Sequence, residues 1–197
     1  MSWNGNEHNV LLRNEGGSAD GVPAFSDCGM AAAADDISDA RGMAFADFDN
    51  DGDLDIIINN NPGDCGKESV APVLLKNNVG QSRNWIVLHL EGSESNRDAL
   101  GAEVRVYSAE FRALRHVHAG AGYASQSDPR LYFGLGTKDV IERISVKWPT
   151  GRTQEFSNVK ANQILFLKEA MELTSAPYEV SNGVTLSEVN PTESPVR

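Results

Sequence analysis

The sequence predicts an all-β protein, and two observations support this fold class. Short runs of alternating apolar and polar residues recur along the chain, and clusters of Gly, Pro, Asn and Asp separate them. The apolar period of a helix is sustained nowhere over a useful length, and the helix-favouring stretch at residues 168–173 is short. Because successive side chains of a strand point to opposite faces, the alternating runs predict half-buried strands joined by turns.

Residues 1–82 are predicted to form a first region of short strands between turn-rich loops. The expected strands are residues 9–13, 42–46, 55–59 and 72–76. The stretch NVLLRN at residues 9–14 returns as PVLLKN at residues 72–77, and this recurrence indicates a repeated sheet unit such as a propeller blade. Little more than one such unit fits into this region.

Residues 83–169 carry clearer strands, which are expected at residues 85–90, 102–108, 130–134, 142–148 and 163–168. Ala102, Val104 and Val106 share one face of the second of these strands, and Ile144 and Trp148 face inward from the fourth. Residues 170–197 are rich in Ser, Thr, Glu, Asn and Pro, and they are predicted to form a disordered tail or a linker.

The formal net charge of −11 is concentrated in one part of the chain. Residues 27–64 hold ten aspartates, no glutamate and one basic residue, Arg41. Strict use of the shorter carboxylate is typical of tight turns and direct metal ligation. The acidic balance makes nucleic acid a poor partner. No stretch approaches the roughly 20 apolar residues of a membrane-spanning helix, so no membrane span is expected.

A nine-residue loop, DFDNDGDLD at residues 47–55, is the clearest candidate site. It places Asp47, Asp49, Asp51 and Asp55 at positions 1, 3, 5 and 9, and Gly52 at position 6. This spacing aims successive carboxylates at one centre, while glycine permits the sharp turn. Clustered carboxylates repel one another without a cation. The loop is therefore predicted to bind Ca²⁺, which suits a large cage of protein oxygens better than Mg²⁺ does.

The remaining aspartate of the loop, Asp53 at position 7, is expected to contribute its backbone carbonyl. An EF-hand shares the first six positions but needs a bidentate glutamate at position 12, where this sequence has Ile58. Ile58 lies in a β-branched run, so the loop leads into a strand. The alternative is an acidic turn that binds nothing, and the spacing, the glycine and the flanking apolar strands favour the metal site. The predicted metal ligands are Asp47, Asp49, Asp51, Asp53 and Asp55.

The stretch GMAFADFDNDGDLDIIINN at residues 42–60 resembles the FG-GAP or VCBS type of repeat, the calcium-loop blade of integrin-like β-propellers. The match is complete at positions 1, 3, 5, 6 and 9 of the loop. The resemblance implies that the loop joins two adjacent strands of a blade and that the ion fixes this hairpin. A closed propeller needs at least about four blades. The chain is therefore expected to be the C-terminal part of a longer protein, with the remaining blades upstream.

Residues 84–169 resemble the ASPIC/UnbV domain of the cartilage acidic protein-like family. Four motifs carry this resemblance: SNRDALGA at 95–102, YASQSD at 123–128, FGLG at 133–136 and WPTG at 148–151. The resemblance implies a β-sandwich-like domain and an exported protein, placed outside the cell, in the periplasm or at the cell surface. It implies no activity. The N-terminal residues lack the features of a signal peptide, so either the chain stays inside or its true start lies upstream. A lone blade is expected to pack on the ASPIC/UnbV sheet or to be poorly held.

Four smaller features leave alternatives open. His116 and His118 share a strand face and could begin a zinc site, although two polar residues on a solvated face is the favoured interpretation. Ser125 could belong to a hydrolase triad, but a turn serine is favoured. Residues 96–98 are expected to form a turn with an internal ion pair rather than a recognition loop. Cys28 and Cys65 permit one disulfide, and two free thiols are equally compatible with the sequence.

Together these features predict a non-catalytic, extracellular calcium-binding module for adhesion, scaffolding or ligand binding, with a protein or a glycan as partner. The alternative is an accessory part of a secreted carbohydrate-active enzyme whose catalytic region lies in missing sequence. A glycosidase needs two carboxylates that flank a sugar site, and no pair outside the loop has a justifying spacing.

Overall fold

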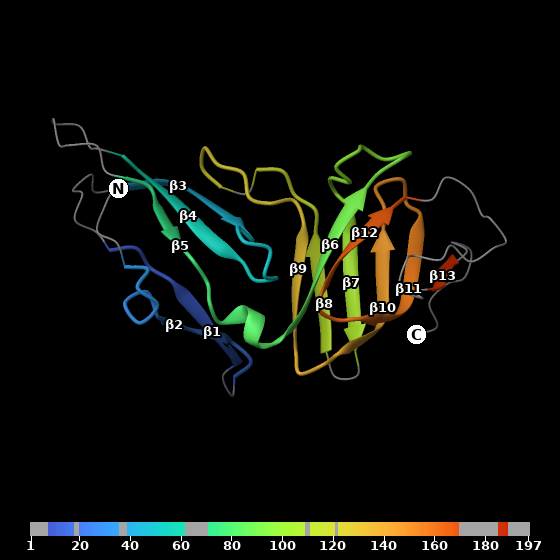
Figure 1. Ribbon diagram of the computed structural model, residues 1–197, viewed down its shortest axis with the longest axis horizontal. Coiled ribbons are helices and arrows are strands. Elements are labelled where there is room, and N and C mark those ends of the chain that lie inside the picture. The colour runs from blue at the N-terminus through green and yellow to red at the C-terminus, as the bar shows by residue number, and fades with distance from the viewer. Residues whose placement is uncertain are drawn as a thin grey trace.

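The computed structural model describes residues 8–17, 20–35, 39–61, 71–108, 111–120, 122–169 and 185–188. These residues form thirteen strands and one short 3₁₀ turn, η1 (Gly80–Ser82), which confirms the predicted all-β class. Two regions lie side by side in Figure 1: β1 to β5, and a sandwich built from β6 to β13. Among the described residues, no helix is long and apolar enough to cross a membrane.

The sandwich has a sheet of three strands facing a sheet of five (Figure 1). The smaller sheet has the order β12 (Gln163–Lys168), β6 (Asn84–Glu91), β9 (Leu131–Gly136), in which β12 and β6 run parallel. The larger sheet is antiparallel and has the order β13 (Thr185–Glu188), β11 (Thr153–Lys160), β10 (Val140–Lys147), β7 (Glu103–Ser108), β8 (Phe111–His116). Most of the tail predicted at 170–197 lies outside the described residues, and its described part, β13, pairs with β11.

One hydrophobic core fills the space between the two sheets. The inward faces predicted from alternation are confirmed, since Val104, Val106, Ile144 and Val146 are fully buried and Trp148 is nearly so. Strand β6 adds its own alternate apolar residues to this core. A core of this size is enough for a domain of about 85 residues to fold around.

The first region contains two separate sheets. β1 (Leu12–Gly17) and β2 (Pro23–Asp27) form an antiparallel pair, and β3 (Asp39–Ala46), β4 (Asp55–Asn61) and β5 (Val73–Leu75) form an antiparallel sheet. The predicted strand at 9–13 begins only at Leu12, and β2 was not predicted. Cys28 donates its thiol hydrogen to the Leu11 carbonyl (Sγ···O 3.3 Å), while Cys65 lies outside the described residues.

The connection between β8 and β9 reaches across to the first region (Figure 1). The Asp128 amide donates to the Phe45 carbonyl (2.8 Å), and the Phe45 amide donates to the Ser127 hydroxyl (3.1 Å). Phe45 lies on β3, so the connection runs along the edge of β3 that is not paired with β4. The first region therefore contacts the sandwich largely through this connection and the start of β6.

Candidate metal centre

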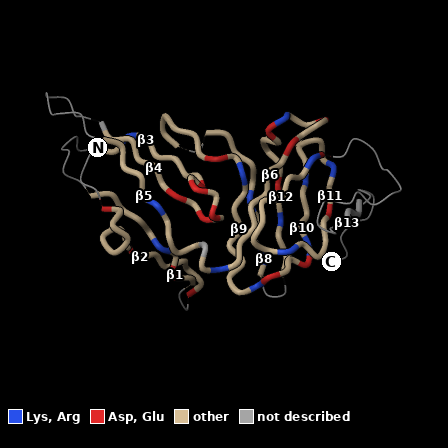
Figure 2. The backbone as a smooth tube through the Cα atoms, viewed as in Figure 1, with Lys and Arg blue, Asp and Glu red and all other residues tan. Residues whose placement is uncertain are grey.

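The aspartate loop is the turn between β3 and β4. The two strands pair up to Ala46 and Asp55, so the loop closes an antiparallel hairpin, as expected for two adjacent strands. Asn50 and Gly52 both have positive φ, at 59° and 95°. Glycine is needed at residue 52 because an added Cβ would lie 1.9 Å from the Trp85 indole. Acidic residues gather at this turn in Figure 2.

Three of the five predicted ligands converge. Asp47, Asp49 and Asp55 each offer a carboxylate oxygen, and these oxygens all lie within 4.8 Å of one another. Two oxygens that bind one Ca²⁺ at about 2.4 Å can lie at most about 4.8 Å apart. The three carboxylates thus satisfy the geometric condition for ligands of one ion, and their hard oxygens suit Ca²⁺.

Backbone amides orient the two buried carboxylates of this cluster. Asp47 accepts hydrogen bonds from the amides of Asp51 (3.0 Å) and Gly52 (3.1 Å). Asp55 accepts one from the Phe48 amide within the loop (2.9 Å) and one from the Asn77 amide after β5 (2.8 Å). Because these bonds join the loop to itself and to the chain beyond β5, the carboxylates are held in place by the fold.

The two other predicted ligands, Asp51 and Asp53, do not belong to the group of three carboxylates with oxygens within 4.8 Å of one another. Alongside the hydrogen bond from Lys76, the Asp51 side chain nevertheless interacts with Asp49 and helps to lower the pKa of Asp49. Asp51 accepts a hydrogen bond from the Asp53 amide (3.2 Å), and its side chain therefore stabilises the turn. The Asp53 side chain packs against Gly80, where an added Cβ would lie 2.5 Å from the Asp53 Cβ. The sequence predicts that Asp53 contributes its backbone carbonyl, and the packing of its side chain against Gly80 is compatible with that prediction.

Lys76 is a residue of the site that the sequence did not reveal. Its ammonium forms an ion pair with the exposed carboxylate of Asp49. The hydrogen bond from Lys76 is the main reason that the pKa of Asp49 is below its ordinary value, and Asp49 raises the pKa of Lys76 in return. Lys76 follows β5, and only the pairing of β5 with β4 brings it to the loop.

The sandwich corresponds to a known family. Residues 92–173 match the family model described as ASPIC and UnbV. This segment is an ASPIC/UnbV domain. The chain is also similar to cartilage acidic protein 1 of Xenopus tropicalis, with 32% identity over 64% of this chain, and to those of Mus musculus and Homo sapiens, each with 30% identity over 72% and 75% of this chain. The chain spans about a fifth of the length of these relatives, since the matches cover 20 to 22% of them.

The ASPIC/UnbV domain contributes a partly buried ion pair beside the aspartate loop. Arg130 donates to Asp128 through Nε (2.7 Å), and Tyr132 donates its hydroxyl hydrogen to the same Asp128 oxygen (2.7 Å). Burial raises the pKa of Asp128, but the hydrogen bonds from Arg130 and Tyr132 outweigh it and hold this pKa below its ordinary value. Arg130 also reaches the Asn50 side chain (3.4 Å), so it links the domain to the loop.

The rival sites find little support in the geometry. Among the described residues, the group that could hold a metal ion contains neither His116 nor His118, whose rings lie 5.7 Å apart on an exposed edge. Asp128 is engaged by Arg130 and Tyr132, so it does not orient a histidine for Ser125. Ser125 instead belongs to a tight turn closed by a bridge to Gly122, as the sequence favoured.

Proposed function

We propose that the chain is a calcium-binding, non-catalytic module in which Ca²⁺ occupies the aspartate loop of an FG-GAP or VCBS-type blade. The convergence of Asp47, Asp49 and Asp55 on one centre carries this proposal. Asp47 and Asp55 are 4% and 2% exposed, and two carboxylates kept so close to each other and to Asp49 are stabilised by a bound dication.

The same loop supports a location outside the cytoplasm, which means outside the cell, in the periplasm or at the cell surface. Sites of this class bind Ca²⁺ with dissociation constants of about 0.1 to 1 mM in extracellular modules. Millimolar calcium would fill such a site, whereas submicromolar calcium would not. The similarity to cartilage acidic protein 1, a protein named after cartilage, supports this location.

The apolar faces of the β3–β4–β5 sheet support the blade interpretation. Ile58 is buried on one face, whereas Ile57 and its cross-strand partner Leu74 are 48% and 47% exposed on the other. A blade inside a propeller packs both faces against neighbouring blades. The relatives are more than three times as long as this chain, which leaves ample sequence for further blades.

Calcium titration of the thermal melting temperature tests the metal centre. At a calcium concentration about ten times the dissociation constant, linkage adds about 1.4 kcal/mol, or a few degrees in Tm. Asp49→Asn is expected to abolish this rise, because Asp49 is the cluster member that does not hold the turn together. Asp139→Asn, at an exposed carboxylate of the sandwich, is the matched control and should keep the rise. A wild-type Tm that does not change on addition of millimolar calcium would contradict the proposed calcium site.

A further inference from the structure

The loop between β6 and β7 is held by one buried carboxylate. Glu169 is 2% exposed, and it accepts hydrogen bonds from the amides of Ser93 (3.0 Å), Glu94 (3.0 Å) and Ser95 (2.7 Å). The hydroxyls of Ser95 (3.0 Å) and Thr150 (2.7 Å) donate to its other oxygen. Five donors on one carboxylate fix the first half of this loop.

The second half of the loop is fixed by its own backbone and by Asn96. The Asn96 side chain accepts from the Leu100 amide (2.8 Å) and donates to the Leu100 carbonyl (3.0 Å). The Gly92 amide donates to the Arg97 carbonyl (3.0 Å), and Ala99 is buried with a φ of 51°. The loop is therefore rigid without any contribution from the side chains of Arg97 and Asp98.

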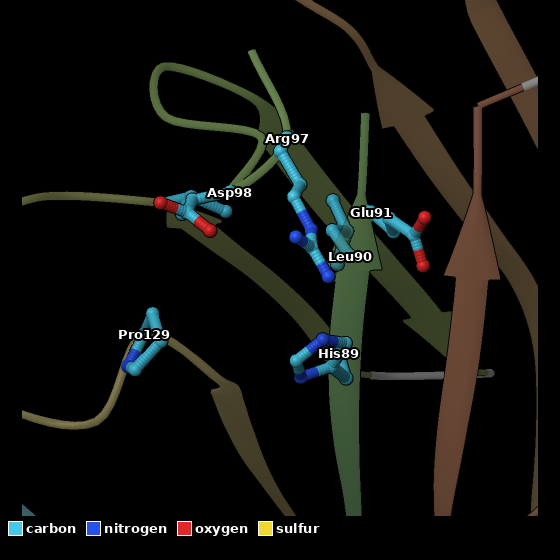
Figure 3. Close-up of a pocket in the computed structure, with 7 residues that line it drawn as sticks. His89, Leu90, Glu91, Arg97, Asp98 and Pro129 are labelled. Atoms are coloured by element: carbon cyan, nitrogen blue, oxygen red, sulfur yellow. The ribbon is translucent and has the colours of Figure 1, made fainter. Parts of the chain in front are cut away.

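Those two side chains enter a pocket of about 430 Å³ between this loop, β6 and the β8–β9 connection. In Figure 3 Arg97 extends along β6 toward His89, Asp98 lies on the neighbouring wall, and Pro129 faces them from the connection. Within the described part of the chain, neither Arg97 nor Asp98 forms an ion pair or a hydrogen bond through its side chain. The predicted internal ion pair of residues 96–98 is thus wrong, because Asn96 closes the turn instead.

The charges at the pocket select against ions. Glu91 is paired with Lys168 (3.1 Å), which leaves Arg97 and Asp98 as one donor and one acceptor of opposite charge. The carboxylates of Glu91 and Asp98 would repel a phosphate, and the Arg97 guanidinium would repel a metal cation. A ligand without net charge that both donates and accepts hydrogen bonds suits the pair, because a guanidinium donates in pairs and a carboxylate accepts in pairs.

The apolar surfaces beside these groups narrow the ligand class. Pro129 and Val117 line the pocket, and the ring of His89 contacts the ring of Phe166, which is 69% exposed (centroids 5.2 Å apart). A sugar ring has vicinal hydroxyls on its edge and a C–H face. The hydroxyls can form hydrogen bonds with Arg97 and Asp98, while the C–H face packs on the apolar surface. The volume also lies within the range of small-ligand pockets, about 300 to 1,000 Å³.

We infer that the pocket formed by Arg97, Asp98, His89 and Pro129 binds an uncharged saccharide through vicinal hydroxyls. This inference goes beyond the proposed calcium-binding function and does not require calcium in the aspartate loop. The pocket is lined by β6, the β6–β7 loop, Val117 and the β8–β9 connection, and none of its lining residues belongs to the aspartate loop.

Saturation-transfer NMR on the full chain tests the inference, with maltotriose, cellotriose, mannotriose and triacetylchitotriose as uncharged probes. At least one of them should bind, and Arg97→Met and Asp98→Asn should each weaken it by about tenfold or more, since each removes charge-assisted hydrogen bonds. Both variants should keep the wild-type Tm, because both side chains are exposed and neither forms a hydrogen bond or an ion pair within the described residues. Arg112→Met, at an exposed arginine of β8 outside the pocket, is the matched control and should bind like wild type.

Three results would overturn the inference: no uncharged trisaccharide binds, both pocket variants bind as well as wild type, or trigalacturonic acid or glycine binds in place of the uncharged probes. Each titration is run once with calcium and once with EDTA. Saccharide binding that survives EDTA supports the pocket even if the calcium-dependent rise in Tm is absent, so the two proposals fail separately.

Discussion

The Lys76 ammonium stands beside a carboxylate group that is arranged for a cation. Its ion pair with Asp49 neutralises part of the charge of the cluster, and half of each side chain or more is shielded from solvent. A dication that binds all three carboxylates must displace this contact or share Asp49 with it. In the proposed calcium site, Lys76 is therefore expected to compete with the ion and to lower calcium affinity.

Lys76→Met should strengthen calcium binding. The gain is expected to be about two- to fivefold in Kd, because solvent screens an exposed ion pair and keeps its contribution small. Isothermal titration calorimetry measures the change. Lys147→Met on β10 removes the same charge far from the loop and should leave Kd unchanged. Weaker binding by Lys76→Met would mean that this ammonium helps to shape the site.

Glu169 makes stability depend on pH. Burial raises its pKa, but the hydrogen bonds from Ser95, Thr150 and Ser93 outweigh burial and lower the pKa below its ordinary value. A lowered folded-state pKa adds stability above the unfolded pKa, and this stability is lost as the pH falls through the folded pKa.

Glu169→Gln should therefore cost about 1 to 3 kcal/mol of unfolding free energy at pH 7, because buried amides lose a charged acceptor. The difference from wild type should shrink as the pH falls below about 4. Urea unfolding at both pH values measures it, with Asp139→Asn as the control. If the difference in unfolding free energy between wild type and Glu169→Gln were the same at both pH values, the negative charge of Glu169 would not be its cause.

At the scale of elements, alternation predicted the sandwich strands well because one face of each strand meets a single core. β11 escaped prediction because Asn158, with a φ of 57°, interrupts the alternation, so that Phe156 and Val159 are both buried. The carboxylate cluster was predictable because its members all lie within one nine-residue stretch of the sequence. Lys76 and Arg130 were not, since strand pairing and the β8–β9 connection bring them to the loop.

The close approach of Gly52 to Trp85 predicts that Gly52→Ala lowers the unfolding free energy substantially. Gly52 has positive φ and also faces the Trp85 indole, so the substitution adds a clash to backbone strain. We expect a loss of about 2 to 4 kcal/mol in urea unfolding. Gly16→Ala is the matched control, because Gly16 has a φ of 90° with nothing within 4 Å and suffers strain alone. If both variants lost the same unfolding free energy, the Trp85 indole would move away from the added methyl group without an energetic penalty.

At the scale of the whole molecule, the aspartate loop lies where the two regions meet. Trp85 of β6 covers Gly52, Arg130 reaches Asn50, and the Asp128 amide donates to the Phe45 carbonyl of β3 just before the loop. An ion that orders the loop would also order the surface that the sandwich contacts. If the loop binds calcium as proposed, calcium binding and the contact between the two regions are thermodynamically linked.

Tryptophan fluorescence should report this linkage. Calcium is expected to change the emission of Trp85, with a midpoint equal to the Kd from calorimetry, because the indole packs on the loop that binds the ion. Trp85→Phe should abolish the change while calcium still binds. The buried Trp148, in the sandwich core, provides a constant background. If the Trp85→Phe variant kept the calcium-dependent change in emission, a tryptophan other than Trp85 would be its source.

The hydrogen bonds between Phe45 and the β8–β9 connection have a further consequence for solubility. A strand border with unpaired amides and carbonyls is a template for intermolecular β-pairing, and natural proteins shield such borders. Here the shield comes from a different part of the chain, more than 80 residues downstream of β3. If residues 8–82 were produced alone, both this border and the apolar pair Ile57 and Leu74 would be bare, and fibrillar or amorphous self-association would compete with folding.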